Sequence, residues 1–119
     1  MKIGIVITSF NNEETLEKTI RSAAALKKNA VLYFGGWINP EIESIAAYCC
    51  EKGITLIEDC AHSLGSTLNG KHSGLYGFAG VYSLYATKAI PAGEGGLIVT
   101  NNEKLDEEIK KKIKTRLSC

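Results

Sequence analysis

Three short apolar runs, separated by two segments with helical periodicity, constrain the fold of this chain most strongly. The runs are rich in β-branched residues, which is typical of strands buried on both faces, and they cover residues 3–9, 30–34 and 54–59. In residues 11–28 and 39–53 the apolar positions instead recur every three to four residues. This β-α-β-α-β alternation predicts an α/β fold, with a mostly parallel sheet and flanking helices.

Capping and turn residues set the expected limits of the second and last helices. Asn39 is the expected cap of the second helix, Pro40 is expected in its first turn, and Gly53 is placed to end it. Asn101 or Asn102 is the expected cap of an amphipathic helix that closes the chain at residue 117. The basic run at residues 110–112 alternates with acidic and apolar residues, which favours a solvated helix face over a nucleic-acid patch.

A hairpin and two further strands are expected between these helices. Asn69-Gly70 is a strong signal for a tight hairpin turn. Residues 79–85 and 96–100 are mostly apolar, and each is followed by polar or glycine-containing sequence, so they are expected to form two more strands. Since no linker or repeat interrupts the chain, we expect residues 1–119 to form a single domain or part of one.

Composition narrows the classes of protein and partner. The chain is 45% hydrophobic and 23% charged, with a formal net charge of +1, so its charge does not select nucleic acid or a membrane as partner. The apolar run near the start is too short to span a membrane and lacks the pattern of a secretory signal. The four cysteines show no Cys-x-x-Cys spacing, so we expect reduced thiols, no metal site and a cytoplasmic location.

Polar residues follow the ends of two predicted strands. Asp59 ends the third strand, Ser83 lies near the end of the fourth, and Lys88 follows it. Parallel sheets bind ligands at the carboxyl ends of their strands, so a site is expected at this edge. An acid, an aromatic ring, a hydroxyl and a lysine are the groups that pyridoxal phosphate needs, and Asp59, His62, Ser83 and Lys88 can supply them. The spacing alone leaves open that Lys88 is an ordinary surface lysine.

The motifs of residues 56–100 resemble a known family. "LIEDCAH" is followed by the Gly-rich hairpin, by "VYS", by "TK" and by "GEGG" leading into "LIVT". In this order they resemble the central segment of the DegT/DnrJ/StrS-type sugar aminotransferases, which are fold-type I pyridoxal-phosphate enzymes. The resemblance implies a partial version of the fold-type I large domain.

The resemblance also implies roles for individual residues. Lys88 matches the lysine that holds pyridoxal phosphate as a Schiff base, and Asp59 matches the partner of the pyridine nitrogen. His62 matches the residue that lies against the ring, and Ser83 matches a hydroxyl that contacts the phosphate. The turn at residues 93–96 is interpreted as architectural.

The family reaction implied by this match is transamination of a nucleotide-linked keto-sugar, with glutamate as amino donor. Family members that lack the lysine are dehydratases, so Lys88 favours transamination. A homodimer or another self-associated state is expected, because family sites lie at a dimer interface and because exposed strand edges favour pairing.

The expected domain is incomplete relative to the family. Residues 1–119 match its middle, without the upstream phosphate-binding loop or the downstream small domain. Whether the isolated chain is an enzyme is therefore left open. One alternative is a catalytically silent fragment, or an interaction module of the same fold. A weaker alternative is a glycosyltransferase fragment, because residues 1–25 also resemble the first strand and helix of those enzymes, although no Asp-x-Asp motif follows.

Overall fold

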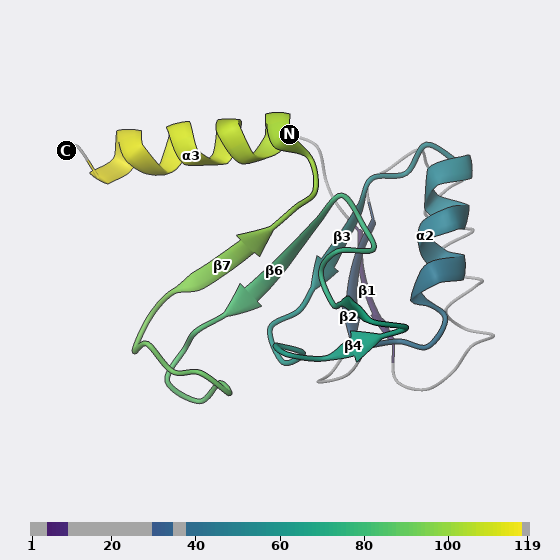
Figure 1. The fold of residues 1–119 in the computed structure, drawn as a ribbon, viewed down its shortest axis with the longest axis horizontal. Helices are drawn as coiled ribbons and strands as arrows, with labels where there is room; N and C mark the ends of the chain where they lie inside the picture. Colours follow the sequence, from purple (N-terminus) through teal and green to yellow (C-terminus); the bar gives the residue numbers. More distant parts are fainter. Residues whose placement is uncertain (1–4, 10–29, 35–37, 118–119) are drawn as a thin grey trace.

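The computed structural model describes residues 5–9, 30–34 and 38–117. Within these residues the chain forms seven strands and two helices, arranged as in Figure 1. The elements in chain order are β1 (Ile5–Ser9), β2 (Ala30–Phe34), α2 (Ile42–Glu51), β3 (Leu56–Asp59), β4 (Thr67–Leu68), β5 (Lys71–His72), β6 (Ala79–Ser83), β7 (Gly96–Val99) and α3 (Glu103–Leu117). The helix expected in residues 11–28 lies outside the described residues.

A five-stranded mixed sheet with the order β1-β2-β3-β6-β7 organises the fold. The first four strands run parallel, and β7 pairs antiparallel with β6. The expected α/β class with a mostly parallel sheet is therefore confirmed, with β7 as the antiparallel exception. β7 follows β6 through a local loop, which returns the chain along the neighbouring strand without a helical crossover.

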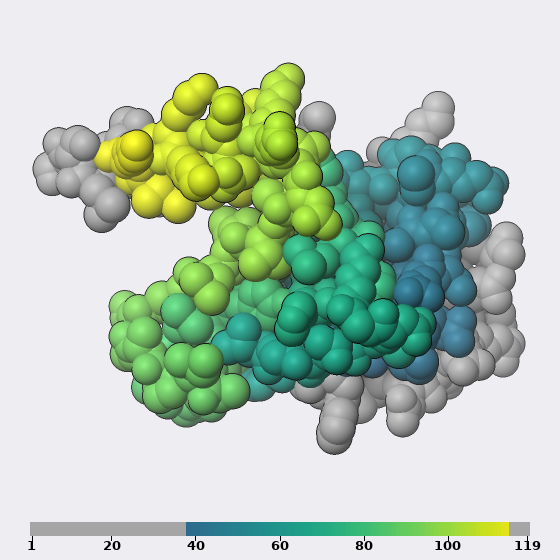
Figure 2. Space-filling model, viewed as in Figure 1, coloured from purple at the N-terminus to yellow at the C-terminus, as the bar shows by residue number. Residues whose placement is uncertain are grey.

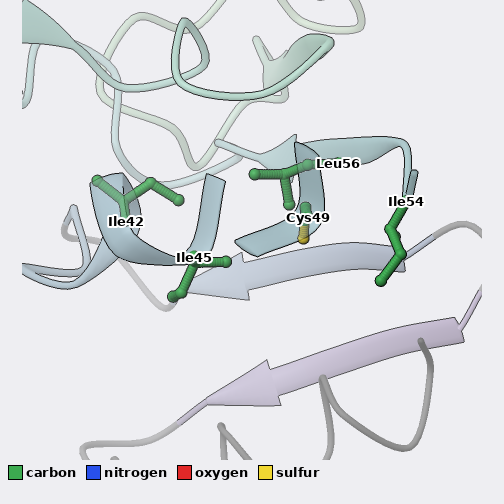
Figure 3. Close-up of a cluster of buried hydrophobic side chains, with 5 residues drawn as sticks. All are labelled: Ile42, Ile45, Cys49, Ile54 and Leu56. Atoms are coloured by element: carbon green, nitrogen blue, oxygen red, sulfur yellow. The ribbon is translucent and has the colours of Figure 1, made fainter. Parts of the chain in front are cut away.

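The core of the described part lies between α2 and β3. Ile42, Ile45 and Cys49 line one face of the helix at i, i+3 and i+7, as expected for an amphipathic helix. They form one buried cluster with Ile54 and Leu56, which lie before and at the start of β3 (Figure 3). This packing fixes β3, and with it the position of Asp59 at the end of that strand.

The start of α2 differs from the sequence-based expectation. The sequence predicts that Asn39 caps the helix directly, but the helix begins at Ile42. Asn39 Oδ1 instead accepts a hydrogen bond from the Glu41 N–H at 2.7 Å, and Asn39 O accepts one from Ile42 at 3.1 Å. Asn39 thus forms a turn before the helix, through Pro40. Gly53 follows the helix with φ at 64°, as expected for a glycine that ends a helix.

The hairpin and the last helix follow their predicted signals. Asn69 and Gly70 adopt φ values of 51° and 77°, which are those of a type I′ turn joining β4 to β5. Asn102 Oδ1 accepts a hydrogen bond from the Leu105 N–H at 2.9 Å, so Asn102 is the cap of α3. Lys110, Lys111 and Lys112 are all exposed on α3, as a solvated face requires.

Strand β7 and helix α3 lie at one end of the molecule. Figure 2 shows α3 and the loop of residues 84–95 projecting from the body with an open notch between them. β7 connects the two and is one of the two edge strands of the described sheet (Figure 1). Within the described part, no helix is long and apolar enough to cross a membrane.

Candidate active site

The carboxyl ends of β3 and β6 place two of the predicted site residues at one edge of the sheet. Asp59 is the last residue of β3 and is in register with Val81 of β6. Ser83 is the last residue of β6, two positions further along. The parallel pairing continues past Asp59, because the Cys60 N–H donates to Val81 O at 2.8 Å. Both side chains are half-buried, as expected at the mouth of a site.

The side chain of Asp59 stabilises the turn that follows β3. Its Oδ1 accepts a hydrogen bond from the Ala61 N–H at 3.0 Å, which closes a tight turn immediately before His62. No hydrogen bond to Oδ2 is formed within the described part of the chain. One carboxylate oxygen of Asp59 therefore holds the local backbone, and the other is available to a ligand.

Ser83 has a similar arrangement at the end of β6. Its Oγ accepts a hydrogen bond from the Tyr85 N–H at 3.3 Å. A serine hydroxyl has two acceptor lone pairs and one O–H donor, so this contact leaves the donor free for an anionic group. The Lys88 N–H then donates to Tyr85 O at 2.9 Å, which turns the chain after β6.

The loop that carries Lys88 is closed at its base by the backbone of Leu84. The Leu84 N–H donates to Gly95 O, and the Ala92 N–H donates to Leu84 O, both at 2.9 Å. Gly93 and Gly95 adopt φ values of 80° and 154°, a region that favours glycine. The "GEGG" sequence therefore has an architectural function here, because it returns the chain from the loop into β7.

His62 and Lys88 are in direct contact. Lys88 Nζ lies 2.7 Å from His62 Nε2, which is hydrogen-bonding distance across 26 positions of sequence. His62 is exposed and Lys88 is half-buried, so a ligand can reach both groups. The turn after β3 and the loop after β6 thus bring an imidazole and an amine together.

The other two predicted residues share the sheet edge, and their side-chain hydrogen bonds in the described part of the chain go to the backbone. Among the described residues, no hydrogen bond or ion pair joins Asp59 or Ser83 to Lys88. The structure therefore places all four predicted residues at or just beyond the ends of β3 and β6, and connects two of them directly. Also within the described ranges, no group of three or more His, Cys, Asp or Glu side chains is arranged to hold a metal ion.

Glu58 is a supporting residue that sequence reasoning did not identify. Its side chain is 4% exposed, and its carboxylate accepts hydrogen bonds from the backbone N–H groups of Gly74, Tyr76 and Gly77 at 2.7–2.8 Å. These bonds fix the segment that leads into β6. The signal that points to such a role is an acidic residue that shares the buried face of its strand with Leu56, before a glycine-rich segment.

A buried polar network lies next to Asp59. Ser73 Oγ donates to Ser63 O at 2.8 Å, and the Tyr82 hydroxyl donates to Ser73 O. Burial raises the pKa of the Cys60 thiol to about 11, and burial also raises the pKa of Tyr82. These groups stay neutral at physiological pH, so they support the site without adding charge to it.

Comparison with known proteins identifies the family. The sequence profile of the DegT/DnrJ/EryC1/StrS aminotransferase family matches residues 9–115. That match includes most of the opening segment that also resembles glycosyltransferases.

Individual relatives agree with this match. The chain is 41% identical over 63 residues to GDP-perosamine synthase of Vibrio cholerae, covering 53% of this chain and 17% of that protein. It is 37% identical over 70 residues to the UDP-4-amino-4,6-dideoxy-N-acetyl-beta-L-altrosamine transaminase of Helicobacter pylori, covering 59% and 19%. The crystal structure of the aminotransferase TlmJ from Streptoalloteichus hindustanus matches with a TM-score of 0.67 and 32% identity, covering 71% and 23%.

The chain spans about a fifth of the length of these relatives. Within that segment, the sequence profile, the curated relatives and the fold agree. The chain belongs to the DegT/DnrJ/EryC1/StrS aminotransferase family.

Proposed function

We propose that this chain is the cofactor-binding segment of a pyridoxal-phosphate-dependent sugar aminotransferase, with Lys88 as the residue that holds the cofactor. The observation that carries the proposal is the position of the Lys88 amine. It lies 2.7 Å from His62 Nε2, just beyond the sheet edge at which Asp59 and Ser83 end β3 and β6.

The chemistry of Lys88 fits an aldehyde-bearing cofactor. Among the described residues its Nζ contacts the imidazole of His62, a side chain that can be uncharged, and forms no ion pair with a carboxylate. An amine in an ion pair would have to lose that partner before reacting. The half-buried position limits the space that the side chain explores while leaving the amine accessible.

Asp59 and Ser83 fit the two polar ends of the same cofactor. The carboxylate of Asp59 has one oxygen available, and it can accept a hydrogen bond from a protonated ring nitrogen. The Ser83 hydroxyl has its donor available for a phosphate oxygen. When bound, pyridoxal phosphate supplies the electron sink that stabilises negative charge at the carbon undergoing transamination.

Within that reaction Lys88 has two tasks: it binds the cofactor, and its amine then moves a proton. The proposed substrate is a nucleotide-linked keto-sugar, with glutamate as amino donor. Support comes from relatives named as a perosamine synthase and an altrosamine transaminase. We also propose a homodimer, supported by the exposed apolar residues of the edge strand β7.

A titration with pyridoxal phosphate tests the proposal. Addition of the cofactor should produce an absorption band that borohydride reduction converts into a stable pyridoxyl group, located on Lys88 by peptide mapping. Lys88→Ala should lose both signals, whereas Lys71→Ala, which removes an exposed lysine of β5, should keep them. A band that persists in Lys88→Ala would contradict the assignment.

Turnover is tested separately, with glutamate and keto-sugar nucleotides. Covalent binding without turnover would support the alternative of a catalytically silent segment, or of a module that needs a complementary chain. If the chain neither binds the cofactor nor turns over these substrates, the proposed function is refuted, and only its fold and family membership remain.

A further inference from the structure

We propose that His62 is a positioning residue for Lys88. Its unprotonated Nε2 accepts a hydrogen bond from the Lys88 ammonium, and this bond lowers the reactivity of the accessible amine until the cofactor binds. The inference rests on the proposed function in one respect, which is that the contact prepares Lys88 for a cofactor. Its evidence is the contact between the two side chains, with Lys88 Nζ 2.7 Å from His62 Nε2.

The donor and the acceptor in this contact follow from the chemistry of the two groups. A lysine ammonium has three donors and no acceptor, so His62 Nε2 must be the acceptor when Lys88 is protonated. The proton of a neutral imidazole must then reside on Nδ1. The contact therefore selects one tautomer of His62, and a doubly protonated imidazolium cannot form it.

The backbone on both sides holds the pair in place. His62 follows the turn that the Asp59 carboxylate closes through the Ala61 N–H at 3.0 Å. Lys88 follows β6 in a turn closed by its own N–H, which donates to Tyr85 O at 2.9 Å. A free lysine side chain samples many rotamers, and a fixed acceptor reduces that freedom before the cofactor arrives.

This role is separable from the one that the family resemblance gives to the same residue. A residue that lies against the cofactor ring needs a flat face, whereas a residue that positions the amine needs an acceptor atom. His62→Phe keeps a flat face and removes the acceptor. His62→Gln keeps an acceptor oxygen and a planar amide, and His62→Ala removes both.

Trace acetylation with acetic anhydride, without cofactor, measures the reactivity of the Lys88 amine. The extent at Lys88 is determined by peptide mapping and divided by that at Lys104, an exposed lysine of α3. Loss of a partly exposed hydrogen bond to a charged group should raise this ratio about five-fold in His62→Ala and in His62→Phe. His62→Gln should stay within about two-fold of the wild type, because its amide oxygen can accept the same bond.

His72→Ala is the matched control, because it removes the exposed histidine of β5. Its ratio should equal that of the wild type. Equal ratios in His62→Phe and His62→Gln would overturn the proposal, and so would a wild-type ratio in His62→Ala.

A measurement on the unaltered chain avoids dependence on the folding of any variant. Long-range ¹⁵N–¹H correlation spectra of the imidazole should show His62 as the Nδ1–H tautomer near neutral pH. A predominant Nε2–H tautomer or an imidazolium would contradict the proposal. Because neither readout uses pyridoxal phosphate, failure of cofactor binding would refute the proposed function and leave this inference standing, and the reverse also holds.

Discussion

The Gly74 N–H donates a 2.8 Å hydrogen bond to Glu58 Oε2, which ties the segment after the hairpin to the buried side of β3. Tyr76 and Gly77 donate to Oε1 of the same carboxylate, each at 2.7 Å. Both oxygens are therefore satisfied by backbone donors, and none of the three donors belongs to a charged side chain. β6 begins at Ala79, two residues after Gly77, so these bonds set where that strand starts.

We expect Glu58→Ala to lower the free energy of unfolding by about 2–4 kcal/mol, because it leaves three backbone donors of a buried turn without an acceptor. Glu58→Gln should also be destabilising, since its amide NH₂ would face donors in place of one oxygen. Urea denaturation followed by circular dichroism measures both. Glu107→Gln, on the exposed face of α3, is the control and should change stability by less than about 0.5 kcal/mol.

A second prediction concerns Gly80, where two backbones meet. A Cβ at Gly80 would lie 2.2 Å from the Gly74 Cα and 2.7 Å from its carbonyl oxygen. Backbone atoms cannot move aside as a flexible side chain can, so Gly80→Ala must displace β6 or the segment tied to Glu58. We expect a loss of about 3 kcal/mol or more in the free energy of unfolding.

Gly70→Ala provides the comparison for that variant. Gly70 has φ at 77°, and a Cβ added there would meet no described atom within 4 Å. The substitution therefore costs only left-handed strain, about 1 kcal/mol. Equal losses in the two variants would show that the close approach of Gly74 and Gly80 has no energetic consequence.

The elements that the sequence predicts well are those with strong local signals. The Asn69-Gly70 turn and the glycine that ends α2 depend on backbone conformations that few residues adopt. The Asn102 cap depends on a short side chain that can accept a hydrogen bond from the first turn of the helix. The start of α2 is predicted less well. Asn39 is the expected cap of the helix, but it forms a turn through Pro40 and Glu41, and the helix begins only at Ile42. Local signals of this kind predict that a helix or strand is present more reliably than they predict the residue at which it begins.

The site shows the same division between local and long-range information. The strand ends and the family resemblance place Asp59, His62, Ser83 and Lys88 at one sheet edge. The 2.7 Å contact of His62 with Lys88 joins residues 26 positions apart, and no local pattern reports such a distance. The role of Glu58 is missed for the same reason, because its three donors lie 16–19 positions further along the chain.

A third prediction concerns stability at alkaline pH. Burial raises the pKa of Cys60 to about 11 from 9.0, so the folded state keeps its proton where the unfolded state loses it. The contribution of Cys60 to stability is complete below pH 9 and is lost as the pH rises to about 11. That loss amounts to about 2–3 kcal/mol. In Cys60→Ala the free energy of unfolding should fall less steeply over this range.

Urea titrations at about pH 7, 9, 10 and 11 measure how steeply the free energy of unfolding falls with pH. Tyr82 also has a raised pKa through burial, so part of the alkaline dependence should remain in the variant. Cys50→Ala removes an exposed thiol of α2 and should retain the wild-type slope. An identical pH dependence in wild type and Cys60→Ala would contradict the prediction.

The last prediction concerns the edge strand β7, which carries exposed apolar residues on both faces. Ile98 is 50% exposed and is in register with Val81, which is 41% exposed, while Leu97 on the opposite face is 46% exposed. The outer edge of β7 also presents main-chain groups that a further strand can pair with. We therefore expect the chain to self-associate through this edge, in a reversible and concentration-dependent manner.

Ile98→Lys places a charge at the centre of this surface and should shift the association equilibrium toward the monomer by about ten-fold, as charged residues on edge strands oppose pairing. Sedimentation velocity over a range of protein concentrations measures the shift. Ile113→Lys is the matched control, because Ile113 is 52% exposed but lies on α3 away from the strand edge. If both variants associate as the wild type does, or if the wild type is monomeric at all concentrations, then the β7 edge does not mediate self-association of this chain.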